Sequence, residues 1–327
     1  MNKLVISYRG GSKLIMETIV KSLPNLKSIK LIPLNSISRS DIHIEIDYNE
    51  QQSRLIGNFN VLILWEPATV VPRQYTNSIL KKFDLIIAMG ESRGENLKTN
   101  NWAHHPYQFK TYPCNEKLRK NDAVMINSVK FSANKKSLYG FRRKVSRSLN
   151  ELNINYALIG DNWHMNKNKE FRERAWALRK ELRSGNIPNI KEVYSDFFYK
   201  YPEYVGRIDD KIKELSKYKY AIIIENEADF VSEKLFDAIA AKCVPIYVGP
   251  NLKKYKKLSK CIIPFDPNLN EIVNFFKSNN EKLYLEKKIF INNSANYLSD
   301  IKIFSLENTS KKIAKLLHEF LVLHRLS

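Results

Sequence analysis

The stretch from Tyr220 to Pro250 reads YAIIIENEADFVSEKLFDAIAAKCVPIYVGP and carries the clearest fold signal in this 327-residue chain. A short apolar run, Tyr220–Ile224, ends at an acidic turn, and a segment with helical spacing of apolar residues, Ser232–Ala241, follows it. A second apolar run, Val244–Val248, completes the unit. A strand, a helix and a second strand in this order are typical of a parallel sheet whose connecting helices cover its faces.

The same alternation of short apolar runs and longer amphipathic segments continues on both sides of this unit. The other expected strands are Leu4–Ser7, Ile29–Ile32, Ile42–Ile46, Val61–Trp65, Asp84–Met89, Val124–Val129, Tyr156–Ile159 and Cys261–Phe265. The other expected helices are Lys13–Ser22, Tyr75–Lys82, Leu138–Leu152, Phe171–Arg183, Ile208–Leu215 and Leu269–Phe276. The pattern predicts an α/β fold built from two Rossmann-like domains.

An irregular polar stretch, residues 91–122, separates the two series and sets the expected domain boundary near Asp122. We therefore expect one Rossmann-like domain over residues 1–122 and a second over residues 123–305. Residues 306–327 are expected to form an amphipathic C-terminal helix whose basic side chains include Lys311, Lys312 and Lys315. A helix of this kind packs across the two domains or lies on a membrane surface.

The composition limits the classes of partner and compartment. The formal net charge is +20, from 54 Lys and Arg against 34 Asp and Glu, which predicts an anionic partner such as nucleic acid, a phosphorylated ligand or an acidic membrane face. The cysteines Cys114, Cys243 and Cys261 are odd in number and far apart, which excludes a disulfide framework and a CxxC zinc site. Because no window offers about 18 uninterrupted apolar residues, we expect no transmembrane helix and a cytoplasmic protein.

The start of the helix after Ile224 is a candidate anion site. Ser232 is placed to cap this helix, and its first N–H groups and dipole suit a phosphate. Lys234 adds a full positive charge in the first turn, where a lysine is normally unfavourable. Either a bound anion or an ion pair with Glu233 or Glu227 explains this lysine, and the residues alone leave both open.

Three segments together resemble one known family. The run IEN…DFVSEKLFDAIAAKCVPIYVG resembles the donor-binding motif of glycosyltransferase family 10, the α-1,3/1,4-fucosyltransferases. Residues 206–226, GRIDDKIKELSKYKYAIIIEN, resemble the lead-in to that motif, and residues 131–151, FSANKKSLYGFRRKVSRSLNE, are similar to an earlier strand–loop–helix segment. The combined order and spacing make the resemblance specific, whereas no single segment would.

The resemblance implies a fold and an activity. It implies two Rossmann-like domains that face a cleft, the GT-B arrangement, and transfer of fucose from GDP-fucose with inversion and without an obligatory metal or other cofactor. The implied acceptor is a hydroxyl of a glycan or a lipid-linked oligosaccharide, bound by the N-terminal domain. A related nucleotide sugar in place of GDP-fucose stays open as an alternative.

The resemblance also implies roles for individual residues. Arg142 and Lys234 match the family's diphosphate-binding Arg and Lys. Glu233 matches a carboxylate that holds the nucleotide ribose. Glu225 and Asn226 match the EN pair that lines the donor pocket.

Phe230 departs from the family pattern, which usually has Tyr at this position near the phosphates. The change removes a hydroxyl group. It therefore bears on the phosphate geometry and on the identity of the donor, and it is the one feature that favours an inactive, lectin-like relative.

Glu66 is the candidate catalytic base. Inverting transfer needs a base that takes the acceptor's hydroxyl proton from the side opposite the leaving nucleotide, hence from the N-terminal half. Glu66 follows the apolar run Val61–Trp65, and Pro67 favours an extended conformation at Glu66. Family members have a Glu in the comparable loop. Glu91 and Glu95 are competing candidates.

Two basic segments bear on further classes of partner. Residues 130–147 contain seven Lys and Arg and no acid, which would suit a nucleic-acid backbone and makes a basic nucleic-acid-binding protein the alternative function. Because no RNA- or DNA-binding motif accompanies them, we expect no nucleic-acid partner. From the basic side chains of the C-terminal helix we expect the protein to associate peripherally with the inner face of an anionic membrane. The pairs His104–His105 and Asp209–Asp210 lack the spacing of metal ligands, and no metal site is expected.

Overall fold

The computed structural model describes residues 4–11, 13–24, 29–88, 107–109, 119, 121–128, 132, 134–161, 163, 199–278 and 280–324. The chain divides into two compact units, one of residues 1–108 together with 302–327 and one of residues 109–301. The boundary thus lies earlier than the one expected near Asp122. The reason is that Phe109 packs against Tyr297 at 6.4 Å between ring centroids and Arg119 donates hydrogen bonds to Tyr218 and Ala241, so both belong to the second unit.

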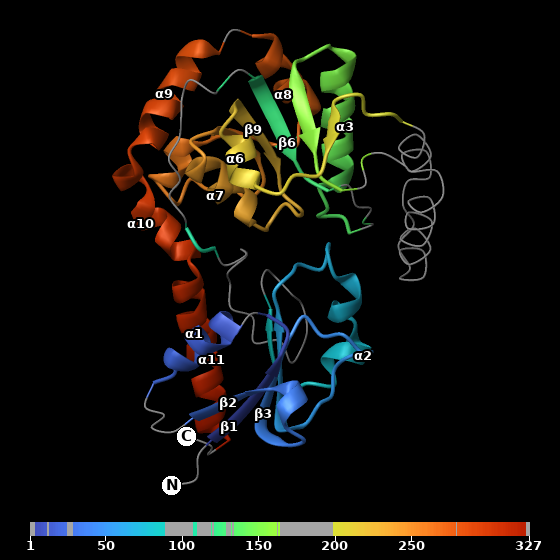
Figure 1. The fold of residues 1–327 in the computed structure, drawn as a ribbon, viewed down its shortest axis with the longest axis vertical. Helices are drawn as coiled ribbons and strands as arrows, with labels where there is room; N and C mark the ends of the chain where they lie inside the picture. The colour runs from blue at the N-terminus through green and yellow to red at the C-terminus, as the bar shows by residue number, and fades with distance from the viewer. Residues whose placement is uncertain are drawn as a thin grey trace. The chain divides into compact units, whose positions relative to one another are not determined.

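The first unit contains a parallel sheet whose described strands run in the order β2-β1-β3-β4-β5 (Figure 1). The strands are β1 (Leu4–Arg9), β2 (Ile29–Pro33), β3 (Ser40–Ile46), β4 (Gly57–Leu64) and β5 (Leu85–Ala88). The second half of β4 is completely buried, as expected for a central strand covered on both faces. The helices of this unit that the structure describes are α1 (Lys13–Lys21), α2 (Asn77–Leu80) and α11 (Leu306–Leu323).

Helix α11 belongs to the first unit and does not form a separate part of the chain. It lies beside α1 (Figure 1). Its Phe320 ring meets the ring of Phe59 on β4 edge to face, with 5.5 Å between the ring centroids. Its apolar residues Ile313, Leu317 and Leu321 are buried there. Most of the apolar face that could lie on a membrane surface is therefore covered by the protein itself.

The second unit contains a parallel sheet with the described strand order β11-β10-β9-β6-β7-β8. Its strands are β6 (Asn121–Ile126), β7 (Tyr156–Ile159), β8 (Tyr204–Gly206), β9 (Tyr218–Ile224), β10 (Val244–Val248) and β11 (Ile263–Phe265). Its helices within the described residues are α3 (Tyr139–Glu151), α6 (Lys211–Leu215), α7 (Glu233–Ala240), α8 (Leu269–Lys277), α9 (Glu281–Asn292) and α10 (Leu298–Ile301). The chain leaves β6 toward β7 and later returns to β9 on the other side, so the strand order reverses between β6 and β9. In open α/β sheets, ligands bind at the carboxyl ends of strands at such a reversal.

The expected strand–helix–strand unit is confirmed as β9, α7 and β10. The expected helix over Tyr75–Lys82 is wrong in its length, because a 3-10 turn, Pro72–Tyr75, precedes the short α2. The expected strand over Val124–Val129 ends at Ile126, after which the Asn127 carbonyl accepts from the Trp163 indole instead of continuing the ladder. The helix expected over residues 171–183 lies outside the described residues.

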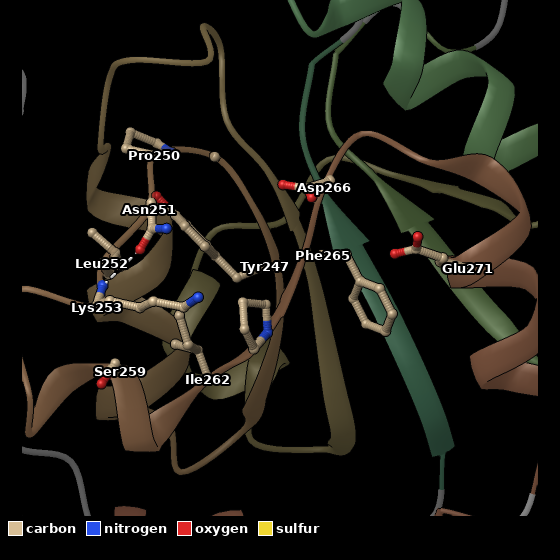
Figure 2. A pocket seen from close by; sticks show the side chains of 12 residues that line it. Tyr247, Pro250, Asn251, Leu252, Lys253, Ser259, Ile262, Phe265, Asp266 and Glu271 are labelled. Carbon is tan, nitrogen blue, oxygen red and sulfur yellow. Dashed lines mark hydrogen bonds between the residues drawn. The ribbon is translucent and has the colours of Figure 1, made fainter.

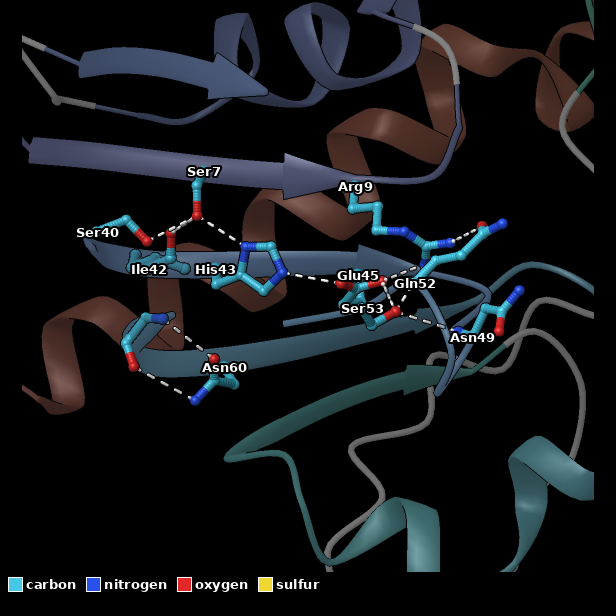
Figure 3. A network of polar contacts seen from close by, with 11 residues as sticks. Ser7, Arg9, Ser40, Ile42, His43, Glu45, Asn49, Gln52, Ser53 and Asn60 are labelled. Carbon is cyan, nitrogen blue, oxygen red and sulfur yellow. Dashed lines mark hydrogen bonds and ion pairs between the residues drawn. The ribbon is translucent and has the colours of Figure 1, made fainter. Parts of the chain in front are cut away.

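A buried polar network links β1 and β3 in the first unit (Figure 3). The Ser7 hydroxyl lies 2.7 Å from His43 Nδ1, and His43 Nε2 lies 2.9 Å from Glu45 Oε1. Arg9 Nη1 donates to Glu45 Oε2 at 3.0 Å, which brings a positive charge to the buried carboxylate. Ser7, His43 and Glu45 are all 0% exposed, and Ser7 also contacts the Ser40 hydroxyl, so this Ser–His–Glu series has a structural role and no access for a substrate.

We predict that Glu45→Ala lowers the free energy of unfolding by about 3–5 kcal/mol, because it leaves Arg9 and His43 without their buried partner. Urea denaturation measures this loss. Glu50→Ala is the control, since Glu50 pairs with Arg73 and Lys82 at the exposed surface, where ion pairs contribute little. Equal losses in the two variants would contradict a stabilising role of the buried network.

Two glycines of the second unit offer a matched test of its packing. Gly160 and Gly206 are hydrogen-bonded neighbours with φ of +132° and +110°. A Cβ at Gly160 would lie 2.2 Å from the Asn127 carbonyl oxygen, whereas at Gly206 it meets nothing within 4 Å in the described residues. Alanine at either position costs about 1–3 kcal/mol of backbone strain, and we predict that Gly160→Ala costs a further ~1–3 kcal/mol in urea denaturation. Equal stabilities of the two variants would contradict the close approach at Asn127.

Candidate functional site

The second unit brings most of the predicted site residues together at the carboxyl end of β9. The residues concerned are Arg142, Glu225, Asn226, Phe230, Glu233 and Lys234. Arg142 comes from α3, the next three from the β9–α7 connection, and the last two from the first turn of α7. Hydrogen bonds and close charges connect all of them except Phe230, whose side chain is buried within the connecting turn.

Glu225 is the centre of this cluster. Its carboxylate is 0% exposed, and both of its oxygens accept hydrogen bonds from Ser232, one from the backbone N–H at 3.0 Å and one from the hydroxyl at 2.5 Å. Ser232 does occupy the N-cap position of α7, as predicted, but its side chain makes no capping bond because it donates to Glu225 instead. The first turn of α7 therefore has no side-chain cap from Ser232, which leaves its N–H groups suited to another acceptor.

Burial shifts the pKa of this carboxyl group. Burial raises the pKa of Glu225, whereas the Lys234 charge and the bonds from Ser232 lower it and leave a net increase. Tyr247 on β10 lies beside Glu225, and burial together with the Glu225 charge holds the pKa of the phenol well above its usual value. Gly249 allows this packing, because a Cβ there would lie 2.6 Å from the Tyr247 hydroxyl and 2.7 Å from Glu225 Cγ.

Arg142 is buried, with 2% of its surface exposed, and it holds the end of β9 in place. Its Nε donates to the Ile224 carbonyl and its Nη2 donates to Asn226 Oδ1, both at 2.8 Å. Its guanidinium also lies over the Tyr139 ring at 4.8 Å. Burial lowers the pKa of Arg142 to about 10, so it stays charged at neutral pH. The predicted contact of Arg142 with a phosphate would have to use Nη1.

Lys234 is half-buried at the first turn of α7, and its Nζ donates to the Ser232 hydroxyl at 3.0 Å. Within the described part of the chain it forms no ion pair with Glu233 or Glu227. Glu233 instead faces Lys211 of α6, whose Nζ lies 3.4 Å from Glu233 and 2.8 Å from Asp237. The pairing with Glu233 or Glu227 is therefore not present, but the buried carboxyl group of Glu225 lies close enough to interact with the Lys234 charge. An acidic neighbour within the protein and a bound anion both account for a lysine at this position.

Asn127 is a further candidate site residue, which the sequence analysis missed. It follows β6, the strand next to β9 at the reversal of strand order, and it is 4% exposed. Among the described residues its buried Oδ1 has no hydrogen-bond partner. Together with Lys211 and Lys234 it lines a cavity of about 10 Å³, close to the size of one water molecule. The sequence analysis placed Asn127 inside the strand expected over Val124–Val129, and only the earlier end of β6 at Ile126 puts it at the carboxyl edge of the sheet.

Glu66 lies in the first unit, directly after β4, and its backbone is held on both sides. Its carbonyl accepts a hydrogen bond from the Tyr75 hydroxyl at 2.9 Å. The Asp47 carboxylate accepts from the Trp65 N–H at 2.9 Å and also bonds the Glu66 backbone. Burial raises the pKa of Asp47, and these two bonds oppose that increase. The role of Glu66 as a base stays a prediction, and the competing residues 91 and 95 lie outside the described residues.

Several other candidate sites receive no support from the structure. The groups needed for a metal ion, three or more His, Cys, Asp or Glu together, do not occur among the described residues, and His104–His105 lies outside them. Asp210 caps α6 by accepting from the Lys213 N–H at 2.9 Å. Arg142 and Arg143 of the basic segment are both buried, which weakens its use as a nucleic-acid surface. No described helix is both long and apolar enough to cross a membrane.

The comparisons with known proteins show the fold. No protein-family model matches the chain. HepE of Anabaena in complex with UDP and glucose is 11% identical, with a TM-score of 0.53 over 97% of this chain and 99% of that one. An E. coli trehalose-6-phosphate protein bound with UDP-2-fluoro glucose is 12% identical, with a TM-score of 0.50 over 87% and 74%. The two parallel-sheet domains are thus those of the GT-B glycosyltransferase fold.

Two further similarities concern fucosyltransferases. An α1,3-fucosyltransferase structure is 15% identical, with a TM-score of 0.48 over 88% of this chain and 80% of that one. A fucosyltransferase-like protein of Arabidopsis thaliana is 40% identical over 57 residues, which make up 16% of this chain. The match covers 11% of the plant protein, so the chain corresponds to a small part of it.

We predict that Glu225→Gln changes the pH dependence of stability. A carboxyl group whose pKa rises on folding adds stability that is complete below its ordinary pKa of 4.5 and is lost as the pH rises through the raised value. Glutamine keeps the shape and cannot titrate. The stability of the wild type relative to Glu225→Gln should therefore fall as the pH rises above the ordinary pKa of 4.5, as urea denaturation at a series of pH values measures. Parallel curves for the two proteins would contradict the burial of an ionisable carboxyl group here.

Proposed function

We propose that the protein is a glycosyltransferase that uses a nucleoside-diphosphate sugar, with GDP-fucose as the leading donor. The observation that carries the proposal is the cluster of Glu225, Ser232 and Lys234 at the start of α7. It lies at the carboxyl edge of the sheet, beside the reversal of strand order, where ligands of such sheets bind. The GT-B fold and the family 10 resemblance support the same reading.

The proposed role of the cluster is to bind the donor diphosphate. The first N–H groups of α7 and the positive end of its dipole suit an anion, and Lys234 adds a charge beside them. When the bond between the sugar and the diphosphate breaks, negative charge develops on the leaving phosphate, and fixed cations stabilise it. This supply of positive charge from the protein is how the reaction would proceed without an obligatory metal.

The proposed reaction is a direct displacement with inversion. Glu66 takes the proton of the acceptor hydroxyl while the acceptor oxygen attacks the anomeric carbon of the donor sugar. The bond from that carbon to the diphosphate oxygen breaks, and the nucleoside diphosphate leaves with the bonding electrons. Glu233 is proposed to hold the ribose, and Asn226, fixed by Arg142, to line the donor pocket.

The choice of fucose and guanine is the finer part of the proposal. It rests on the resemblance to family 10 and on the short match to the fucosyltransferase-like plant protein. The proteins with a similar fold that were crystallised with UDP or a UDP-sugar make uridine donors the alternative. A glycan or lipid-linked acceptor, and peripheral attachment to a membrane on the cytoplasmic side, are proposed from the sequence alone.

We predict that Lys234→Ala weakens the binding of nucleoside diphosphates at least tenfold, because a charged contact to phosphate contributes about 1.5–3 kcal/mol. A thermal-shift panel with GDP, UDP, CDP and GDP-fucose measures the effect, since a ligand of the folded state raises its stability. Lys213→Ala is the control, because Lys213 is an exposed lysine on the nearby helix α6. A wild type that none of the four ligands stabilises would rule out the proposed function, and equal shifts in wild type and Lys234→Ala would remove Lys234 from the site.

A further inference from the structure

A second cavity of about 290 Å³ lies in the second unit at the carboxyl ends of β10 and β11 (Figure 2). The loop after β10, from Gly249 to Lys253, forms one wall, with Asn251 and Lys253 among its side chains. Phe265 and Asp266 at the end of β11 and Glu271 on α8 form the opposite wall. No part of the proposed diphosphate site lines this cavity.

The cavity adjoins the Glu225 cluster through two shared residues. Tyr247 and Gly249 line the cavity, and both also lie against Glu225, as the tight packing at Gly249 shows. Strands β9, β10 and β11 lie side by side in the sheet. Along the carboxyl edge of this sheet, the start of α7 with Lys234 follows β9, and the cavity lies at the ends of β10 and β11. The start of α7 and the cavity therefore lie at neighbouring strand ends on one edge of the sheet.

The residues that line the cavity indicate which chemical class of ligand it suits. Asp266 and Glu271 are carboxylates, and Lys253 is the one cation among the lining residues. Two carboxylates repel a phosphate but accept hydrogen bonds from hydroxyl groups. The apolar wall of Ile262, Pro264 and Phe265 suits the C–H face of a sugar ring. The volume is near the lower limit of small-ligand pockets, which fits a single ring.

We infer that this cavity holds the sugar ring of the donor, with Asp266 and Glu271 as the residues that accept hydrogen bonds from its hydroxyl groups. The inference rests on the proposed function, because it takes a nucleoside-diphosphate sugar as the ligand. In this arrangement, residues at the ends of β10 and β11 determine which sugar the protein binds, and the start of α7 binds the diphosphate. Affinity for the sugar nucleotide and affinity for the free nucleotide should then depend on different residues.

The test compares Asp266→Asn and Glu271→Gln with the wild type in calorimetric titrations against GDP-fucose, UDP-glucose, GDP and UDP. For whichever sugar nucleotide the wild type binds, each variant should lose about tenfold or more in affinity, since a hydrogen bond to a charged group is lost. The affinity for the matching nucleoside diphosphate should not change. Glu286→Gln, at an exposed position on α9, is the control and should bind all ligands as the wild type does.

Three results would overturn the inference. Equal losses for the sugar nucleotide and the free nucleotide would place the base, and not the sugar, in the cavity. Unchanged affinities in both variants, with unchanged melting temperatures, would show that the cavity binds no part of the donor. A wild type that binds none of the four ligands would refute the proposed function itself, and the inference with it, which separates this failure from the first two.

Discussion

The buried carboxylate of Glu225 is the constraint on which the rest of the candidate site depends. Glu225 directly follows β9, and its carboxylate accepts hydrogen bonds from both the backbone N–H and the hydroxyl of Ser232, the residue before α7. The same group lies against Tyr247 and requires Gly249 at the end of β10. One carboxylate thus joins two neighbouring strand ends and a helix start, and Lys234 gains its position through the Ser232 hydroxyl.

Arg142 complements this constraint from the other side. It binds the last carbonyl of β9 and the Asn226 side chain, so the residues on both sides of Glu225 are held by charged hydrogen bonds. To make these bonds, the guanidinium group of Arg142 is removed from water, and this burial lowers its pKa. A site that keeps buried charges in this way is organised before any ligand arrives, as catalysis by fixed charges requires.

The sequence could predict the parts of the fold that depend on local patterns. The spacing of apolar residues correctly predicted β9, α7 and β10. The family resemblance identified the residues that cluster around Glu225. It could not predict that the Ser232 hydroxyl turns away from its helix, because that choice depends on a carboxylate seven positions earlier in a buried setting. Nor could it predict that residues 302–327 return to the first unit, since this depends on packing against distant α1 and Phe59.

The most direct test of the account is amide hydrogen exchange of the whole protein with and without saturating GDP-fucose or UDP-glucose. The account predicts that a bound donor slows exchange at the start of α7, residues 232–235, and in the loop after β10, residues 249–253, because its phosphates and sugar lie against these backbones. Binding with no added protection in either segment, and with protection elsewhere, would contradict the placement of the donor beside Glu225.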